Sequence, residues 1–369
     1  MTVPLSILDL SPVPEGADAP TALRNTVDLA QHAERWGFRR FWVAEHHFVA
    51  VASSAPAVLI GAIAAATNTI RVGAAAVQLG HTTAAAAVEA FGTLEAFYPG
   101  RIDFGVGRSA QRRRAAMQGT SGATQLGQEW REVDGVVVPP PWDMSALARN
   151  PRLRAQLAVL QQPEAVAPDF GDQLDDILAM LAGRYQFDDV DANPVPGAGS
   201  GLTPWIFGSS KGESAQVAGA NGLPFVASYH ITPATALDAV EAYRAAFRPS
   251  AALTEPYVVV SADVVVADDH ATAVHLATSY EHWVHSIRSG DGAIPYPDPD
   301  RVAPLPEADR ESVRDRIATQ FVGDPDQVAD KLAALQRVTG ADELVITSVT
   351  HSHADRLRSH QLIAKRWGL

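Results

Sequence analysis

Short apolar segments alternate with longer amphipathic or alanine-rich segments along nearly the whole chain. The short segments predict strands over residues 6–10, 40–44, 70–79, 102–106, 205–207, 225–228, 257–266 and 343–348. The longer segments predict helices over 22–36, 55–66, 83–97, 173–181, 211–220, 233–247, 268–288, a stretch ending at 320, 324–339 and a last stretch ending at 367. Regular alternation of this kind is typical of parallel strands joined by right-handed crossovers.

Eight strands, each followed by a helix, predict an α/β fold of the TIM (β/α)8-barrel type. An open, doubly wound sheet also accommodates eight strands. However, no Pro/Gly/Ser-rich linker divides the chain, and the strand–helix units are spread evenly along it. We therefore predict one barrel domain over residues 1–369.

Two segments interrupt the alternation. Residues 109–171 follow the fourth strand and contain arginines, prolines and polar breaks. We interpret them as an insertion that forms a lid over the barrel mouth, because long loops at that end commonly cover active sites. Residues 289–306 follow the seventh helix and are rich in proline, which predicts a second, irregular insertion.

Composition and charge exclude several classes of protein. Of the 369 residues, 47% are hydrophobic and 19% are charged, which is typical of a globular protein. The net charge of -13 opposes binding to nucleic acids and anionic membranes. With 0 cysteines, the chain has no disulfide, thiolate metal site or cysteine nucleophile. The N-terminus lacks the pattern of a signal peptide, and no apolar run reaches about 18 residues, so we expect a cytoplasmic protein.

Active sites of such barrels lie just after the C-terminal ends of the strands. Glu45, His46 and His47 follow the predicted second strand. A histidine there can act as a general base near neutral pH, and an adjacent carboxylate can orient it. Only one of the two histidines can point into the mouth. The alternative to a catalytic role is a structural one, in which the histidine bonds a backbone carbonyl.

Small and basic residues follow the third and fourth strands. Ala75 and Ala76 lie in the third segment, where small side chains let a flat ligand approach the backbone, although tight packing of helix and sheet explains them equally well. Gly107 and Arg108 end the fourth segment, and the arginine is suited to a phosphate or a carboxylate. The glycines here do not complete a dinucleotide-binding motif.

After the fifth strand, a segment rich in glycine and serine leads into a helix. Gly208, Ser209, Ser210 and Ser214 belong to it. Exposed N–H groups and hydroxyls at a helix N-terminus form an anion site, whereas a plain serine N-cap is the alternative. Because Arg108 supplies a positive charge at the same end of the barrel, we favour phosphate binding as the role of this segment.

No other pattern indicates a metal or a nucleophile. The histidines at positions 275, 282 and 285 lack the spacing of a zinc helix, so we predict no metal site. Residues 112–114 are three arginines, a run that more often forms a solvated surface than an anion clamp. The chain has no Gly-x-Ser-x-Gly elbow, which disfavours acyl transfer.

Six segments together resemble the bacterial luciferase-like monooxygenases, in order and spacing. They are RFWVAEHHF, TIRVGAAAVQLG, AFYPGRIDFGVGRS, PWIFGSS, GLPFVAS and FVGDPDQVADKL. The resemblance covers almost the whole chain and is weakest over residues 109–171 and 290–306. The chain is most similar to the single-gene, luciferase-alpha-like branch of that flavin-dependent family.

The resemblance implies an eight-fold barrel that binds reduced FMN, or the deazaflavin F420 in a sister branch, at its C-terminal mouth. It implies proton transfer by His46 and a cis peptide bond between Ala75 and Ala76 that supports the flavin ring. Arg108, Ser209, Ser210 and Ser214 match positions that hold the flavin phosphate. The remaining residues expected to contact the cofactor are Glu45, Gly107 and Gly208.

By the same resemblance, the expected function is a two-component monooxygenase. A separate NAD(P)H-dependent flavin reductase supplies reduced FMN, and O2 adds to the flavin to give a C4a-peroxyflavin that a dry barrel mouth protects. We expect an aromatic or polyketide-like secondary metabolite as substrate, and a homodimer. The alternatives are F420-dependent hydride transfer and a non-catalytic flavin-binding protein, ahead of a plain barrel hydrolase or isomerase.

The chain departs from the family pattern at the mouth. Gly107 replaces the cysteine of luciferase, and Ser109, Ala110 and Gln111 replace a common Ala-Pro-Gly. Tyr229 stands where a small residue is more usual, and His230 follows it. These differences concern the substrate and not the flavin, so we assign Tyr229 and His230 to substrate binding.

Overall fold

A closed barrel of parallel strands forms the centre of the protein. The computed structural model describes residues 3–108, 129–143, 150–162 and 164–369. Within these ranges the barrel strands are β1 (Leu5–Asp9), β2 (Arg40–Val43), β3 (Arg71–Ala74), β5 (Ile102–Gly107), β10 (Pro204–Gly208), β11 (Phe225–Ala227), β12 (Val258–Val266) and β14 (Glu343–Thr347). Each strand pairs with the next, β5 pairs with β10, and β14 pairs with β1, so the sheet closes. The predicted TIM barrel is confirmed.

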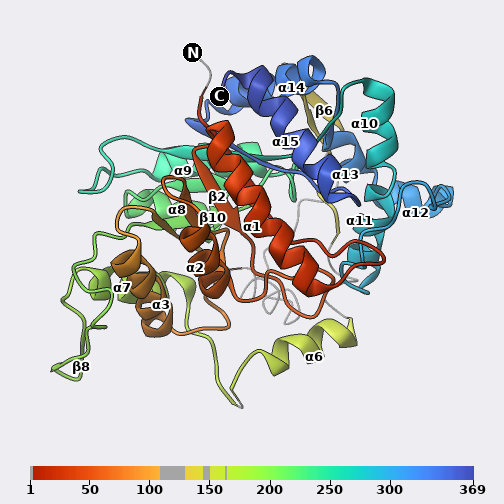
Figure 1. Ribbon diagram of the computed structural model, residues 1–369. Coiled ribbons are helices and arrows are strands. Elements are labelled where there is room, and N and C mark those ends of the chain that lie inside the picture. Colours follow the sequence, from red (N-terminus) through yellow and green to blue (C-terminus); the bar gives the residue numbers. More distant parts are fainter. Residues whose placement is uncertain (1–2, 109–128, 144–149, 163) are drawn as a thin grey trace.

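Helices surround the barrel (Figure 1). They include α1 (Ala19–Trp36), α2 (Pro56–Ala66), α3 (Ala84–Phe97), α8 (Glu213–Ala220), α9 (Ala236–Ala246), α14 (Pro325–Thr339) and α15 (His353–Trp367). Local signals fix their ends: Asp18 caps α1 by accepting the Thr21 N–H, and Gly37 ends it at φ 87°. Asp324 and Gln327 form a capping box at the start of α14. Among the described residues, no helix combines the length and apolar character needed to cross a membrane.

The barrel interior changes from ionic to apolar to polar along its axis. At the N-terminal end, the buried Arg40 binds Glu343 at 3.1 Å and Asp103 at 2.9 Å. Above this plug lies an apolar layer of Leu8, Trp42, Trp205, Val226, Val259 and Val345. Because β-strand side chains alternate between faces, Ser261 and Asp263 share the inward face of Val259 and lie nearer the mouth. The apolar layer therefore lies between the ionic N-terminal end and the polar end of the barrel interior, which is at the C-terminal ends of the strands.

Three predicted elements are interrupted. The third strand stops at Ala74 and resumes as β4 (Val77–Gln78), with the bond between Ala75 and Ala76 in the cis form. The helix predicted over 268–288 divides into α10 (His270–Ala277) and α11 (Tyr280–Ser289), and the helix before residue 320 divides into α12 (Glu307–Glu311) and α13 (Arg314–Thr319). The break before α11 is at Ser279, which is fully buried, so the chain turns there to pack α11 inward.

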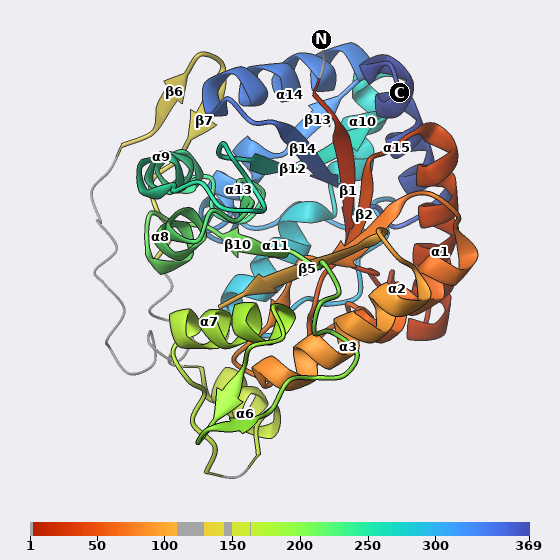
Figure 2. The same cartoon turned by 90° about the vertical axis from the view of Figure 1, so that its left-hand side faces the viewer.

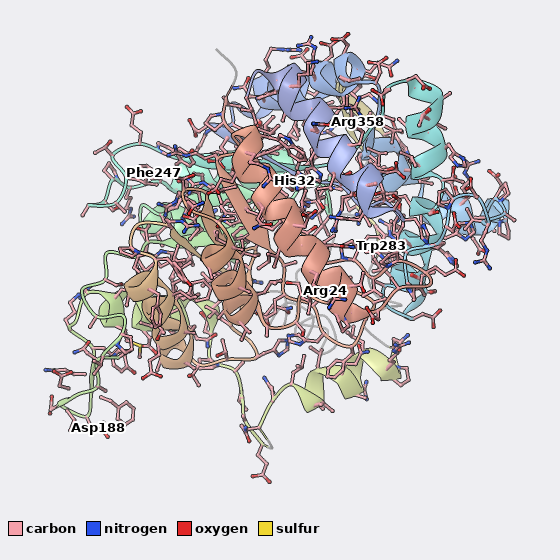
Figure 3. The ribbon with its side chains drawn as sticks, viewed as in Figure 1. Arg24, His32, Asp188, Phe247, Trp283 and Arg358 are labelled. Carbon is pink, nitrogen blue, oxygen red and sulfur yellow. The ribbon has the colours of Figure 1, made fainter. Side chains whose placement is uncertain are left out.

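Among the described residues, three segments were not predicted to form strands: two hairpins and one single strand. A hairpin of β6 (Arg131–Val133) and β7 (Val136–Val138) lies beside α14 (Figure 2), and a second one joins β8 (Gln186–Phe187) to β9 (Val190–Asp191). Asp188, labelled in Figure 3, lies at the tip of the second hairpin, which projects away from the barrel helices. The third segment, β13 (Phe321–Gly323), pairs with β12.

The predicted insertion is only partly described. It contains the β6–β7 hairpin, α6 (Pro151–Val159) and the start of α7 (Phe170–Leu181). Residues 109–128 and 144–149, which include the three arginines at 112–114, lie outside the described residues. The insertion's role as a lid therefore stays a prediction.

Candidate functional site

The barrel mouth has an open half and a covered half. The residues that follow β2, β3, β5 and β10 are half-buried, and these four strands are consecutive in the barrel. Helices α11 and α13 and the loop after α11 contribute to an apolar cluster above the other half, together with Val51 from the loop after β2 and Val349 after β14. All of the predicted cofactor residues except Ser214 come from the open half's strand ends, and Ser214 lies in the helix that follows β10.

Glu45 organises the segment after β2. Its carboxylate accepts a hydrogen bond from Nε2 of His47 at 2.9 Å and another from the Gln78 backbone N–H at 2.9 Å. Gln78 returns a side-chain hydrogen bond to the Glu45 carbonyl at 2.7 Å. The carboxylate thus orients His47 and ties β2 to β4. The sequence left open which histidine this carboxylate orients, and the structure shows that it bonds His47.

His46 reaches the covered half. Its backbone N–H donates to the carbonyl of Ser53 at 2.9 Å, which fixes the segment after β2. Burial first, and then the nearby charges of Arg316 and His46, lower the pKa of His230 to about 3. His46 from β2 and His230 from the loop after β11 therefore lie within electrostatic reach of each other across the mouth.

The cis bond expected between Ala75 and Ala76 is present. Both alanines are half-buried, and they lie between β3 and β4 at the edge of the open half. β5 approaches closely beneath them, because a Cβ on Gly105 would lie 1.8 Å from the Ala74 carbonyl oxygen. A Cβ on Gly107 would meet the Ala76 Cβ at 3.4 Å. Ala75 and Ala76 carry only methyl side chains, so no bulky group at this strand end obstructs a flat ring.

Helix α8 begins at the open half without a side-chain cap. Its N-cap is Gly212, which offers no side chain, so the alternative of a serine N-cap is wrong. The loop before it is fixed, since the Ser209 carbonyl accepts hydrogen bonds from Thr232 at 3.2 Å and from Thr235. Ser214 lies against Gly208, where a Cβ would come within 3.1 Å of the Ser214 Cβ. First-turn N–H groups are therefore available to an anion, and the residues present fit a phosphate.

Arg108 faces this helix start but is not a free cation. It forms an ion pair with Glu213, the first residue of α8. Burial lowers the pKa of Arg108, whereas the nearby Asp169 acts in the opposite direction. Because Glu213 occupies the arginine, an incoming phosphate competes with a carboxylate of the protein itself.

The covered half contains a buried ionic group. Asp263, from within β12, accepts a hydrogen bond from the Gln320 side chain at 3.1 Å. Burial raises the pKa of Asp263 to about 6, and the Arg316 charge opposes this rise. Arg316 from α13 donates to the Tyr280 hydroxyl at 2.7 Å. These residues link three elements at the polar end of the barrel interior.

Of the two predicted substrate residues, only His230 belongs to this group. Its Nδ1 lies 2.5 Å from the Ser261 hydroxyl. Tyr229 is fully buried, and its hydroxyl donates to the Val137 carbonyl at 2.7 Å. Tyr229 thereby anchors the β6–β7 hairpin to the barrel, which is a structural contact that accounts for its hydroxyl.

Three further histidines have ordinary partners. His275 binds Asp300 at 2.9 Å, His282 binds the Ala303 carbonyl at 2.7 Å, and His353 binds Asp28 at 2.8 Å. Among the described residues, no group of three or more metal-ligating side chains converges.

Sequence reasoning missed Glu213, Asp263, Tyr280, Tyr296 and Arg316. Glu213 looks like an ordinary first-turn acid. Asp263 lies inside an apolar strand, and a lone carboxylate within such a run is the signal that marks it in hindsight. Nothing in the spacing of the other three residues connects them with Asp263.

Comparisons with known proteins agree with this architecture. The family model described as luciferase-like monooxygenase matches residues 3–134 and 171–343. The Bacillus subtilis protein YvbT is 36% identical over 98% of this chain and 96% of its own. A luciferase-like monooxygenase of Escherichia coli K12 is 33% identical over the same shares. The crystal structure of apo-MsnO8 superposes with a TM-score of 0.76 at 29% identity, covering 100% of this chain and 99% of that one.

Two more distant structures contain different cofactors. The FMN complex of the oxygenating constituent of 3,6-diketocamphane monooxygenase from Pseudomonas putida has a TM-score of 0.61 at 20% identity, covering 99% of this chain and 97% of that one. An F420-dependent secondary alcohol dehydrogenase has a TM-score of 0.61 at 15% identity, covering 100% and 99%. At these identities the likeness concerns the fold alone.

Proposed function

The chain belongs to the luciferase-like monooxygenase family, and from this membership we propose that it is a monooxygenase that uses reduced FMN. A separate NAD(P)H-dependent flavin reductase supplies the reduced cofactor. One atom of O2 enters an organic substrate and the other leaves as water, while reduced FMN provides the two electrons. The observation that carries the proposal is the start of α8, which has no side-chain cap and lies opposite Arg108, together with the cis bond between the small residues Ala75 and Ala76.

Each residue has a distinct role in this proposal. Arg108 and the first-turn N–H groups of α8 hold the phosphate, with the hydroxyls of Ser209, Ser210 and Ser214 nearby. The flavin ring lies on Ala75 and Ala76. His46 holds or moves a proton between the ring and the covered half, and the apolar cluster over that half excludes water, which strengthens polar interactions inside.

F420-dependent hydride transfer is the rival within the same fold, since solved structures of this architecture carry either cofactor. The test is equilibrium binding of FMN, riboflavin and F420 to the purified chain, measured by calorimetry. The proposal predicts tighter binding of FMN than of the other two. Preferential binding of F420 contradicts it, and so does equal binding of FMN and riboflavin.

We also propose a homodimer formed through α2. This helix contains only apolar residues and glycine, yet Val58 on its outer face is 76% exposed. A groove of about 470 Å³ runs between α2 and α1 beside this face. Apolar surface of this kind, left open on a single copy, is typical of a protein–protein interface.

A further inference from the structure

Four polar groups with unused hydrogen-bonding capacity lie in the covered half of the mouth. Within the part of the chain that the structure describes, the buried Tyr296 hydroxyl, the Thr347 hydroxyl and Arg316 Nε have no partner. Thr347 is the register partner of Asp263, so both side chains face the barrel interior. The fourth group is Nε2 of His230, a side chain that is 7% exposed and bonds Ser261 through its other ring nitrogen. Buried polar atoms without partners are rare in native proteins, and a cluster of them indicates a missing ligand or water.

The surroundings of His230 favour one tautomer. The Ser261 hydroxyl lies 3.3 Å from the Ala227 carbonyl and 2.5 Å from His230 Nδ1, and we assign its proton to the carbonyl, so that its oxygen accepts the hydrogen bond from Nδ1–H. Nε2 then carries the lone pair. Because the pKa of this histidine is lowered to about 3, the ring is neutral at physiological pH. His230 is therefore a hydrogen-bond acceptor, whereas Tyr296, Thr347 and Arg316 each have a donor to offer.

The cluster is close to electrically neutral. Arg316 and Asp263 carry opposite charges and lie near enough for each to shift the other's pKa. An anionic ligand group gains little from Arg316, because Asp263 already neutralises its charge. The same anion is repelled by Asp263 and by the lone pair of His230. A neutral group with both donor and acceptor character fits better.

Aromatic and apolar side chains surround the cluster. The upper apolar cluster includes Tyr280, Trp283 and Tyr296, and the barrel layer beneath includes Trp42 and Trp205. Leu10 packs against both clusters, so they are continuous along one side of the mouth. Such walls suit a flat apolar body, while the polar groups receive one functional group of that body.

We propose that His230, Tyr296 and Arg316 bind the hydroxyl group of an aromatic substrate. The inference rests on the proposed function, because it places this substrate opposite the flavin half of the mouth. A hydroxyl has one donor and two acceptor positions, which complement one acceptor and several donors. It donates to His230 Nε2 and accepts from Tyr296 and Arg316.

The test uses three probes of similar shape. α-Naphthol carries the hydroxyl, α-fluoronaphthalene replaces it by a group of similar size that donates no hydrogen bond, and α-naphthoate carries an anion. Their affinities are measured by calorimetry, with and without saturating FMN. We expect α-naphthol to bind about three- to tenfold more tightly than either of the other probes, the effect of one or two net hydrogen bonds.

Two substitutions of His230 separate binding from structure. His230→Asn keeps a donor near Ser261 but has no group at the Nε2 position, whereas His230→Gln places a carbonyl oxygen near that position and loses the donor to Ser261. The proposal predicts that the hydroxyl preference disappears in His230→Asn and persists in His230→Gln. The reverse pattern overturns it, because the bond to Ser261 would then be what matters.

Tyr296→Phe keeps the inference testable if a His230 variant fails to fold. Because the Tyr296 hydroxyl has no partner, its loss should leave thermal stability unchanged or raised. The substitution should weaken α-naphthol binding about three- to tenfold and leave the affinity for α-fluoronaphthalene unchanged. Equal affinities of the probes, absence of binding or preference for α-naphthoate overturns the inference. FMN binding without a hydroxyl preference overturns this inference alone, and the preference without FMN binding overturns the proposed function alone.

Discussion

Glu45 accepts a hydrogen bond from His47 at 2.9 Å, and its second oxygen binds the backbone of Gln78. The carboxylate that follows β2 therefore fixes the second of the two adjacent histidines. His46 is left to interact with the opposite side of the mouth, where its charge contributes to the lowered pKa of His230. The adjacent histidines thus have separable roles, one in the loop structure and one in the site.

Substitution of His46 should change flavin chemistry without changing flavin binding. In His46→Ala, we expect an FMN dissociation constant within about twofold of the wild type, because the phosphate site is intact. Reoxidation of the bound reduced flavin by O2 should change by at least about a hundredfold, the lower end of the range for a lost proton-transfer group. Stopped-flow absorbance measures it.

His47→Ala is the matched control for this prediction. It removes the contact with Glu45, so it should lower thermal stability while leaving the reoxidation rate near that of the wild type. If His46→Ala reoxidises at the wild-type rate, His46 has no part in the mechanism.

Arg108→Ala should discriminate between flavins that differ only in the phosphate. A hydrogen bond to a charged group contributes about 1.5–3 kcal/mol, so FMN binding should weaken by roughly ten- to hundredfold. Riboflavin binding should change by less than about twofold. Calorimetric titration of both ligands checks this, and an equal loss for both refutes the phosphate role.

Glu213→Gln should strengthen FMN binding. The substitution keeps the first turn of α8 but removes the carboxylate that pairs with Arg108. Removing this carboxylate ends its repulsion of the FMN phosphate at the helix N-terminus. One charge at a helix N-terminus corresponds to about 0.3–1 kcal/mol, or roughly two- to fivefold in affinity. The same titration measures it at low and high salt. Weaker binding would mean that Glu213 positions Arg108 for the phosphate instead of competing with it.

Stability should fall as the pH is lowered below about 6.5. Burial lowers the pKa of His360 to about 4, so the unfolded chain takes up the proton first and the folded state loses free energy between these values. At about pH 5 the loss is about 2 kcal/mol for this residue. His230 acts in the same direction, whereas Asp263, with its pKa raised to about 6, acts in the opposite one.

The variant His360→Asn isolates one part of this pH dependence. Urea unfolding at about pH 7.5 and about pH 5 should show a smaller difference between the two conditions than in the wild type, whatever the variant's absolute stability. An unchanged difference would assign the acid sensitivity to other groups.

The proposed dimer predicts that Val58→Arg produces a monomer. An arginine on the exposed face of α2 places an unpaired charge in an apolar interface, while a single copy tolerates it in water. Light scattering during size exclusion measures the mass, and far-UV circular dichroism checks the fold. A wild-type monomer, or a dimer that survives the substitution, contradicts the use of this face.

The sequence predicts the barrel well, because its strands are short apolar runs between helices with clear ends. It also contains the signals of both missed hairpins. Asp134 and Gly135 have positive φ values of 46° and 87°, and an Asp-Gly pair is a strong indicator of a two-residue hairpin turn. Asp188 and Asp189 adopt a similar conformation, with φ values of 49° and 61°.

The open half of the site was easier to predict than the covered half. His46, Arg108 and Ser209 directly follow strands, so their position in the chain places them at the mouth. Arg316 and Tyr296 come from the cap above the barrel, and only tertiary packing brings them to Asp263. Likewise, the pairing of Arg108 with Glu213 depends on the neighbouring positions of β5 and β10, which the individual motifs do not encode.

The central claim is that the chain binds reduced FMN and controls its reaction with O2. The most direct measurement is an anaerobic titration with reduced FMN, followed by rapid mixing with oxygenated buffer while absorption spectra are recorded. The account predicts saturable binding and a transient spectrum distinct from those of reduced and oxidised FMN. Reoxidation at the rate of free FMN, without a transient, would contradict it.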